Sequence, residues 1–75
     1  MKIVDARDLQ SPEPFERVVE ALSELPLGEQ LKLIIHQEPR PLYRFLERNR
    51  YDYRARGFAD GRFEIVIWEL PPDKA

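Results

Sequence analysis

The chain has 75 residues, 43% of them hydrophobic, and a formal net charge of −2; this composition fits one small folded domain and excludes a disordered chain. It has no cysteine, which excludes disulfides, zinc–thiolate sites and thiol catalysis. No apolar run approaches the roughly 20 residues of a membrane-spanning helix, and the N-terminus has no signal-peptide pattern, so we expect a cytoplasmic protein.

The first half of the chain predicts a strand followed by a helix. Lys2–Ala6 is a short apolar strand, and Ser11 is placed to cap a helix whose first residue is Pro12. An apolar stripe at helical spacing and an acidic stripe on the opposite side support this helix, and Pro26 and Gly28 end it. The apolar stripe is Phe15, Val18, Val19, Leu22 and Leu25, and the acidic stripe is Glu16, Glu20 and Glu24.

The second half predicts a strand, a helix and a hairpin. Glu29–His36 alternates as a strand, and a stiff proline-rich loop leads to a helix from Pro41 to about Asn49. Tyr51–Phe58 and Arg62–Leu70 are strands joined by a turn with an Asp-Gly pair, since both residues can adopt positive φ. The inward-facing apolar residues are Leu31, Leu33, Ile35, Leu42, Phe45, Leu46, Ile65 and Ile67.

The order of elements is strand–helix–strand–helix–strand–strand, in one domain over residues 1–75. We expect an ordered core from about residue 2 to 70 and a frayed tail over residues 71–75. Because a strand–helix–strand unit makes a right-handed crossover, the first two strands should be parallel, with both helices on one face of the sheet. The predicted fold class is therefore α/β (α+β): a two-layer sandwich with a four-stranded mixed sheet whose other face is open.

Two segments resemble a known family. DARDLQSPEP, from Asp5 to Pro14, is similar to the opening of the TusA sulfur carriers, D-A-R-G-L-x-C-P-x-P, but Ser11 stands in place of the sulfur-carrying cysteine. HQEPRPL, from His36 to Leu42, resembles the H-x-x-P-x-P-L stretch of a cysteine-less, SirA/TusA-like bacterial family of unknown function. The chain is identified as a member of that family, which implies the two-layer fold with the last strand between the second and the third.

The resemblance also implies a biological context. Members of the cysteine-less family occur alone or beside hemerythrin-like domains, often among genes of respiratory or nitrogen-oxide metabolism. A serine hydroxyl is too weak an acid to replace the thiolate, so Ser11 cannot support sulfur transfer. The expected role is a small non-catalytic binding or interaction module, without a cofactor.

The loops after the first two strands should meet at one edge of the sheet, where ligands of open α/β sheets bind. The candidate ligand-binding residues there are Arg7, Ser11, Glu13, His36, Glu38 and Arg40. Two helix N-termini favour an anion at this edge, but the prolines remove N–H donors, so Arg40 would contribute most of the recognition. A small-ligand, metal or enzymatic site around Ser11, His36 and Arg40 is the alternative to an interaction module.

Catalysis and metal binding at this edge have little support in the sequence. A Ser11–His36 nucleophile pair lacks a third member and an oxyanion hole. His36 with Glu38 and Glu13 falls short of the usual zinc ligand set. We therefore predict no catalytic residue and no metal site, with Ser11 as a helix cap and His36 as a hydrogen-bonding residue at a strand end.

The open face of the sheet is a second candidate surface. Its expected members are Ile34, Arg54, Arg56, Val66 and Trp68, residue types that favour a protein partner or self-association. The alternative is an ordinary solvated sheet in which Trp68 lies over arginine stems.

The arginines of the second half offer a third function. Residues 1–39 carry a net charge of −4 and residues 40–75 a net charge of +2, with seven arginines between Arg40 and Arg62 interleaved with tyrosines. Such a pattern occurs in RNA-binding proteins. The acidic pI of 5.4 argues against nucleic acid, and the acidic stripe of the first helix offers these arginines ion-pair partners, which is the interpretation we favour.

Overall fold

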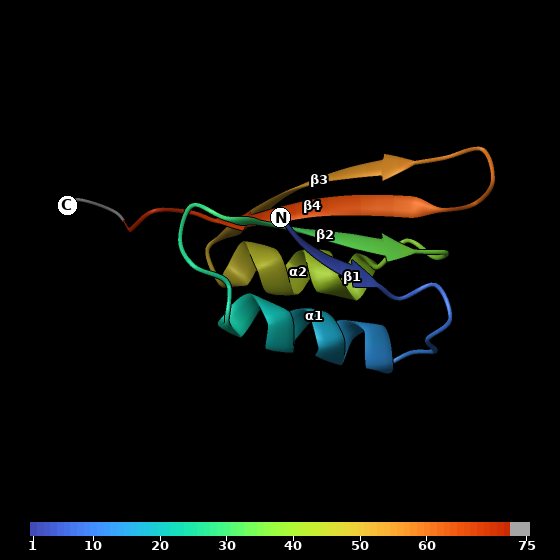
Figure 1. Cartoon of the computed structure of the whole chain (residues 1–75), viewed down its shortest axis with the longest axis horizontal. Coiled ribbons are helices and arrows are strands. Elements are labelled where there is room, and N and C mark those ends of the chain that lie inside the picture. Colours follow the sequence, from blue (N-terminus) through green and yellow to red (C-terminus); the bar gives the residue numbers. More distant parts are fainter. Residues whose placement is uncertain (73–75) are drawn as a thin grey trace.

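The computed structural model describes residues 1–72, and in it two helices cover one face of a four-stranded sheet (Figure 1). The elements are β1 (Lys2–Asp5), α1 (Glu13–Ser23), β2 (Gln30–Ile35), α2 (Arg40–Arg48), β3 (Tyr51–Gly57) and β4 (Phe63–Glu69). Neither helix in this part of the chain is long and apolar enough to cross a membrane. Of the tail that we expect to fray, residues 73–75 lie outside the described residues.

The strands lie in the order β1-β2-β4-β3, which confirms the order that the family resemblance implies. β1 pairs with β2 in parallel, whereas β4 runs antiparallel to both β2 and β3. Because β1 and β2 are parallel, the loops that follow them emerge at the same end of the molecule (Figure 1).

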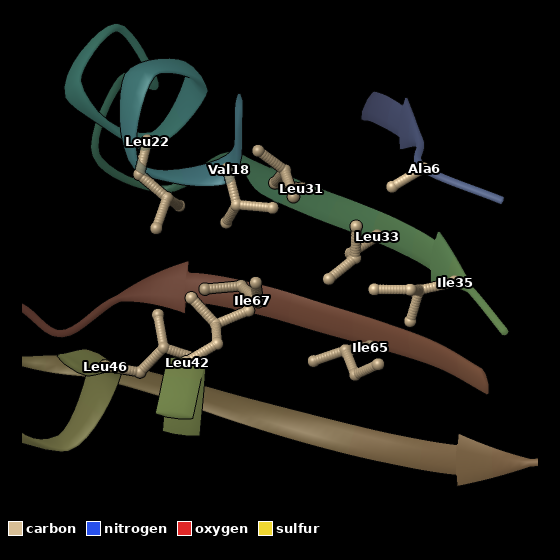
Figure 2. Packing of buried hydrophobic residues seen from close by; sticks show 10 residues of the cluster. All are labelled: Ala6, Val18, Leu22, Leu31, Leu33, Ile35, Leu42, Leu46, Ile65 and Ile67. Atoms are coloured by element: carbon tan, nitrogen blue, oxygen red, sulfur yellow. The ribbon is translucent and has the colours of Figure 1, made fainter. Parts of the chain in front are cut away.

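The core lies between the sheet and the two helices. Ten hydrophobic residues are buried there, and they include the inward faces predicted for the second and fourth strands. Figure 2 shows Val18 and Leu22 of α1 and Leu42 and Leu46 of α2 directed toward the strands. Phe15 of α1 and Phe45 of α2 meet edge to face, with ring centroids 5.6 Å apart, so the helices also contact each other.

The predicted N-cap at Ser11 is wrong. The helix begins at Glu13 with Pro12 in the cap position, and no side chain caps it. Ser11 would have to accept a hydrogen bond from the N–H of Glu13 or of residue 14. The Glu13 N–H instead donates to the Gln10 carbonyl at 2.9 Å, and Pro14 has no N–H to donate.

The β3–β4 hairpin closes through a short loop around Asp60 and Gly61. The Gly61 N–H donates to the Phe58 carbonyl at 3.0 Å, and Gly61 has a φ of +90°. Asp60 does not share the positive φ; its carboxylate accepts the Arg62 N–H at 3.0 Å. The glycine alone therefore supplies the left-handed conformation that the turn requires.

Candidate functional site

A pocket of about 600 Å³ opens between the loops that follow β1 and β2. Its inner lining is apolar, and its mouth carries six polar side chains from the two loops. The apolar lining is Ala6, Leu9, Pro12, Pro14, Phe15, Leu33, Ile35, Pro39, Pro41 and Leu42, and the polar side chains are Arg7, Gln10, Ser11, His36, Gln37 and Glu38. This is the sheet edge at which the sequence predicts a site, and the volume is typical of a small-molecule pocket.

The β1–α1 loop is fixed to the sheet at its start. The Ala6 N–H donates to the Ile34 carbonyl at 2.8 Å, and the Ala6 side chain is buried in the core. The Leu9 N–H donates to the Ala6 carbonyl at 3.2 Å, and this hydrogen bond folds the loop back toward the strand. These contacts place the half-buried Leu9 side chain in the wall of the pocket.

Arg7 at the pocket mouth forms a two-pronged ion pair with Asp5. Its Nη2 and Nε lie 2.7 and 2.9 Å from the two carboxylate oxygens. The Arg7 hydrogen bonds lower the pKa of Asp5 to about 2, which favours the ionised carboxylate, and its negative charge balances the guanidinium at neutral pH. Arg7 therefore brings no unbalanced positive charge to the pocket.

A similar pair two residues apart joins the β2–α2 loop to the first residue of α2. The Arg40 Nε lies 3.4 Å from a Glu38 carboxylate oxygen, and the Tyr43 hydroxyl donates to the other Glu38 oxygen at 3.3 Å. Burial and the Glu38 charge raise the pKa of Tyr43 to about 12, so the hydroxyl keeps its proton and remains a donor. Each of the two charged side chains at the pocket mouth, Arg7 and Glu38, thus has a partner of opposite charge.

Four of the six predicted ligand-binding residues line the pocket: Arg7, Ser11, His36 and Glu38. Glu13 and Arg40 do not line it, and Arg40 has 81% of its side chain exposed. The sequence interpretation missed the apolar lining, above all Leu9 and Phe15. Leu9 could have been predicted as a pocket residue from the sequence, because it is an apolar residue in the middle of a loop.

The pocket contains no recognisable catalytic arrangement. Ser11 and His36 both line it and are both exposed, and no hydrogen bond joins their side chains among the described residues. Within residues 1–72 no three acidic or histidine side chains come close enough to hold a metal ion. The pocket offers a ligand an apolar cavity whose mouth carries uncharged donors and acceptors and two charged side chains, Arg7 and Glu38, each of which forms an ion pair.

The open face of the sheet carries the residues predicted for it. Ile34, Val66 and Trp68 are half-buried, and Arg54 and Arg56 are exposed. The register places Arg54 beside Val66 and Arg56 beside Glu64. Lys32 and Glu64 form an ion pair at 3.5 Å across the same face, so charged pairs separate the apolar residues.

The arginines of the second half do not form one patch. Arg54 and Arg56 alternate with the helix-facing Tyr53, so they lie on the open face, whereas Arg44 and Arg48 belong to α2 on the opposite side of the sheet. Within residues 1–72 no ion pair joins Arg44 or Arg48 to the acidic stripe of α1, so the pairing we expected from the sequence is absent there.

Comparison with known proteins agrees with this architecture. A family described as uncharacterized conserved proteins, DUF2249, matches residues 3–69. A crystal structure of a SirA-like protein from Desulfitobacterium hafniense is similar to this chain with a TM-score of 0.83, at 23% sequence identity, over 95% of this chain and 100% of that one. A search of curated proteins gives no match. The structural similarity confirms the predicted two-layer SirA/TusA-like fold.

Proposed function

The chain belongs to the DUF2249 family of uncharacterized conserved proteins, and we propose that it is a non-catalytic binding module whose pocket takes an uncharged, mainly apolar group. We propose that this group belongs to a small molecule whose buried part is an aromatic ring or a branched aliphatic chain. The observation that carries this proposal is the pocket of about 600 Å³, apolar inside and charge-neutral at its mouth.

Neutrality at the mouth follows from the two ion pairs. The two charged side chains that line the pocket each have a partner two residues away: Arg7 pairs with Asp5 at the end of β1, and Glu38 pairs with Arg40 at the start of α2. An anionic ligand would have to compete with a carboxylate for each arginine, and a cationic ligand with an arginine for each carboxylate. A neutral ligand disturbs neither pair and still gains the free energy of burying its apolar surface.

The prolines at the two helix starts also favour a neutral ligand over an anion. Pro12, Pro14, Pro39 and Pro41 have no N–H, so the two helix starts offer few donors to an anion. The same rings add apolar surface to the pocket wall. The anion preference that helix N-termini usually give is therefore weak at this edge.

We place this module in a bacterial respiratory or nitrogen-oxide pathway on the family resemblance alone, and in the cytoplasm because the sequence shows no membrane span and no signal-peptide pattern. In such a pathway a binding module without catalytic groups would sequester or present a neutral molecule. RNA binding has no observation in its favour once the arginines are divided between two faces.

A set of compounds that share a naphthalene ring and differ in the charge of one small substituent tests the proposal. 2-Naphthalenemethanol, 2-naphthoate and 2-naphthylmethylamine have the same apolar body with a neutral, a negative and a positive group. We expect the neutral compound to bind several-fold more tightly than either ion by isothermal titration calorimetry. Tighter binding of 2-naphthoate would overturn the proposal in favour of an anion site.

A pocket-filling variant and a matched control locate the binding. Ser11→Phe places a ring at the mouth from an exposed residue that caps nothing, so the fold should tolerate it. Asp8→Phe adds the same ring to an exposed residue of the same loop that does not line the pocket. Ser11→Phe should abolish binding of 2-naphthalenemethanol and Asp8→Phe should leave it unchanged.

A further inference from the structure

The two edges of the sheet differ in length and protection. β1 forms one edge with four residues, and β3 forms the other with seven. A long edge strand presents unpaired backbone groups that can pair with another strand. We propose that β3 pairs antiparallel with β3 of a second copy of this chain, which joins the two sheets edge to edge.

The backbone groups available for this pairing follow from the hydrogen bonds at the ends of the β3–β4 ladder. The Phe58 N–H donates to the Arg62 carbonyl and the Leu70 N–H to the Arg50 carbonyl, both at 2.8 Å. Because bonded positions alternate along an antiparallel pair, the even-numbered residues of β3 face β4. The odd-numbered residues, Tyr51, Tyr53, Ala55 and Gly57, therefore direct their N–H and C=O groups outward.

The charges of β3 suit a two-fold arrangement centred on Arg54. In this register Asp52 lies opposite the second copy's Arg56, and Arg56 lies opposite the second copy's Asp52. Both residues are exposed and on the open face, where two cross-strand ion pairs can form. This register also overlaps the full length of the strand, from Tyr51 to Gly57.

The side of β3 that faces the helices is complementary in the same register. Tyr53 stacks on Tyr43 of α2, with ring centroids 4.6 Å apart, so α2 covers this half of the strand. Ala55 and Gly57 remain exposed, because no helix covers the other half. The two-fold axis places Tyr53 of one copy opposite Ala55 of the other. The half of β3 that α2 covers in one copy therefore lies beside the half that is exposed in the other.

Two features keep the association weak and reversible. In the single chain the Asp52 carboxylate accepts the outward N–H of Tyr53 at 2.8 Å, and this bond must exchange for one to the second copy. Arg54 also lies opposite its own symmetry mate, where like charges repel. We therefore expect a dimer that forms with rising concentration and not a permanent one.

Sedimentation velocity across the micromolar to millimolar range tests the proposal. We expect a concentration-dependent monomer–dimer equilibrium that Ala55→Pro abolishes. The proline removes an outward N–H and no bond to β4, so the variant should keep its fold, as judged by circular dichroism. A wild-type protein that stays monomeric throughout the range would overturn the proposal, and so would a dimer that Ala55→Pro leaves intact.

Charge variants test the register independently of the proline. Arg56→Asp alone should weaken the dimer, and the double variant Asp52→Arg with Arg56→Asp should restore it. Arg54→Ser should strengthen it by removing the central repulsion, whereas Arg44→Ser on α2 should have no effect. Weakening by Arg54→Ser, or failure of the double variant to restore association, would contradict this arrangement.

Discussion

Ser11 is the residue at which expectation and structure differ most. It occupies the position of the sulfur-carrying cysteine in the TusA pattern and has the chemistry of a good N-cap, yet it caps nothing. The two prolines that make the motif recognisable also determine this outcome. A capping hydroxyl at Ser11 would accept a hydrogen bond from the N–H of residue 13 or 14. Pro14 has no N–H, and the Glu13 N–H already donates to the Gln10 carbonyl.

Ser11→Ala should therefore change the free energy of unfolding by less than about 0.5 kcal/mol, as for an ordinary surface residue. A serine N-cap would cost about 1 kcal/mol on the same substitution. Urea denaturation monitored by circular dichroism distinguishes the two values. A loss near the larger value would show that the hydroxyl does support the helix in solution.

The Asp5–Arg7 pair predicts a defined pH dependence. Hydrogen bonds from Arg7 lower the pKa of Asp5 from 3.8 to about 2, so the folded state favours the ionised carboxylate. The resulting stabilisation is complete above the unfolded pKa and is lost as the pH falls from 3.8 toward 2. Asp5→Asn should flatten the stability profile over this interval.

An NMR titration of the Asp5 carboxyl carbon measures this pKa directly. We expect a midpoint near 2 in the wild-type chain and a higher midpoint in Arg7→Gln, which loses the guanidinium but keeps the backbone N–H of residue 7 as a donor to Asp5. Arg17→Gln, a change of the same kind at an exposed position on α1, should leave the midpoint unchanged. A wild-type midpoint near 3.8 would mean that the ion pair does not persist in solution.

Among the elements, α2 depends most on its two buried leucines. Leu42 and Leu46 have 1% and 0% of their surfaces exposed, and they lie in the core on the side of Ile67 of β4 (Figure 2). The helix has only nine residues, so its own hydrogen bonds cannot stabilise it without this contact. The pocket wall formed by Pro39, Pro41 and Leu42 therefore depends on the packing of α2 against the sheet.

Leu46→Ala should destabilise the protein by about 2 to 5 kcal/mol, because it leaves a cavity in the core. Leu27→Ala removes the same atoms from a residue with 56% of its surface exposed and should cost far less. Thermal and urea unfolding of the two variants provide the comparison. Equal effects at the two positions would mean that α2 is not packed as described.

Apolar periodicity predicts these elements well for a physical reason. A strand or helix with one buried face must repeat its apolar residues at the matching period, and Leu31, Leu33, Ile65 and Ile67 do so. The pairing of β4 between β2 and β3 has no such local signature, and only the family resemblance predicted it. The neutral mouth of the pocket was not predicted either, because it depends on contacts such as Asp5–Arg7 that spacing alone does not specify.

At the scale of the whole molecule, the two loops and the sheet edge act as one unit. The extents are 43 × 22 × 22 Å, with the loops after β1 and β2 at one end (Figure 1). Parallel pairing of β1 and β2 brings Ser11 and His36 to one pocket from positions far apart in the chain. The proposed dimer edge, β3, is not part of the pocket lining, so binding and association should be separable by mutation.

Chemical-shift mapping of the wild-type chain with 2-naphthalenemethanol tests the central claim most directly. We predict that the perturbed backbone amides lie in residues 6–15 and 35–42 and that 2-naphthoate at the same concentration perturbs them much less. Shifts centred on the open face, at Ile34, Val66 and Trp68, or a stronger response to 2-naphthoate, would contradict a neutral apolar site in this pocket.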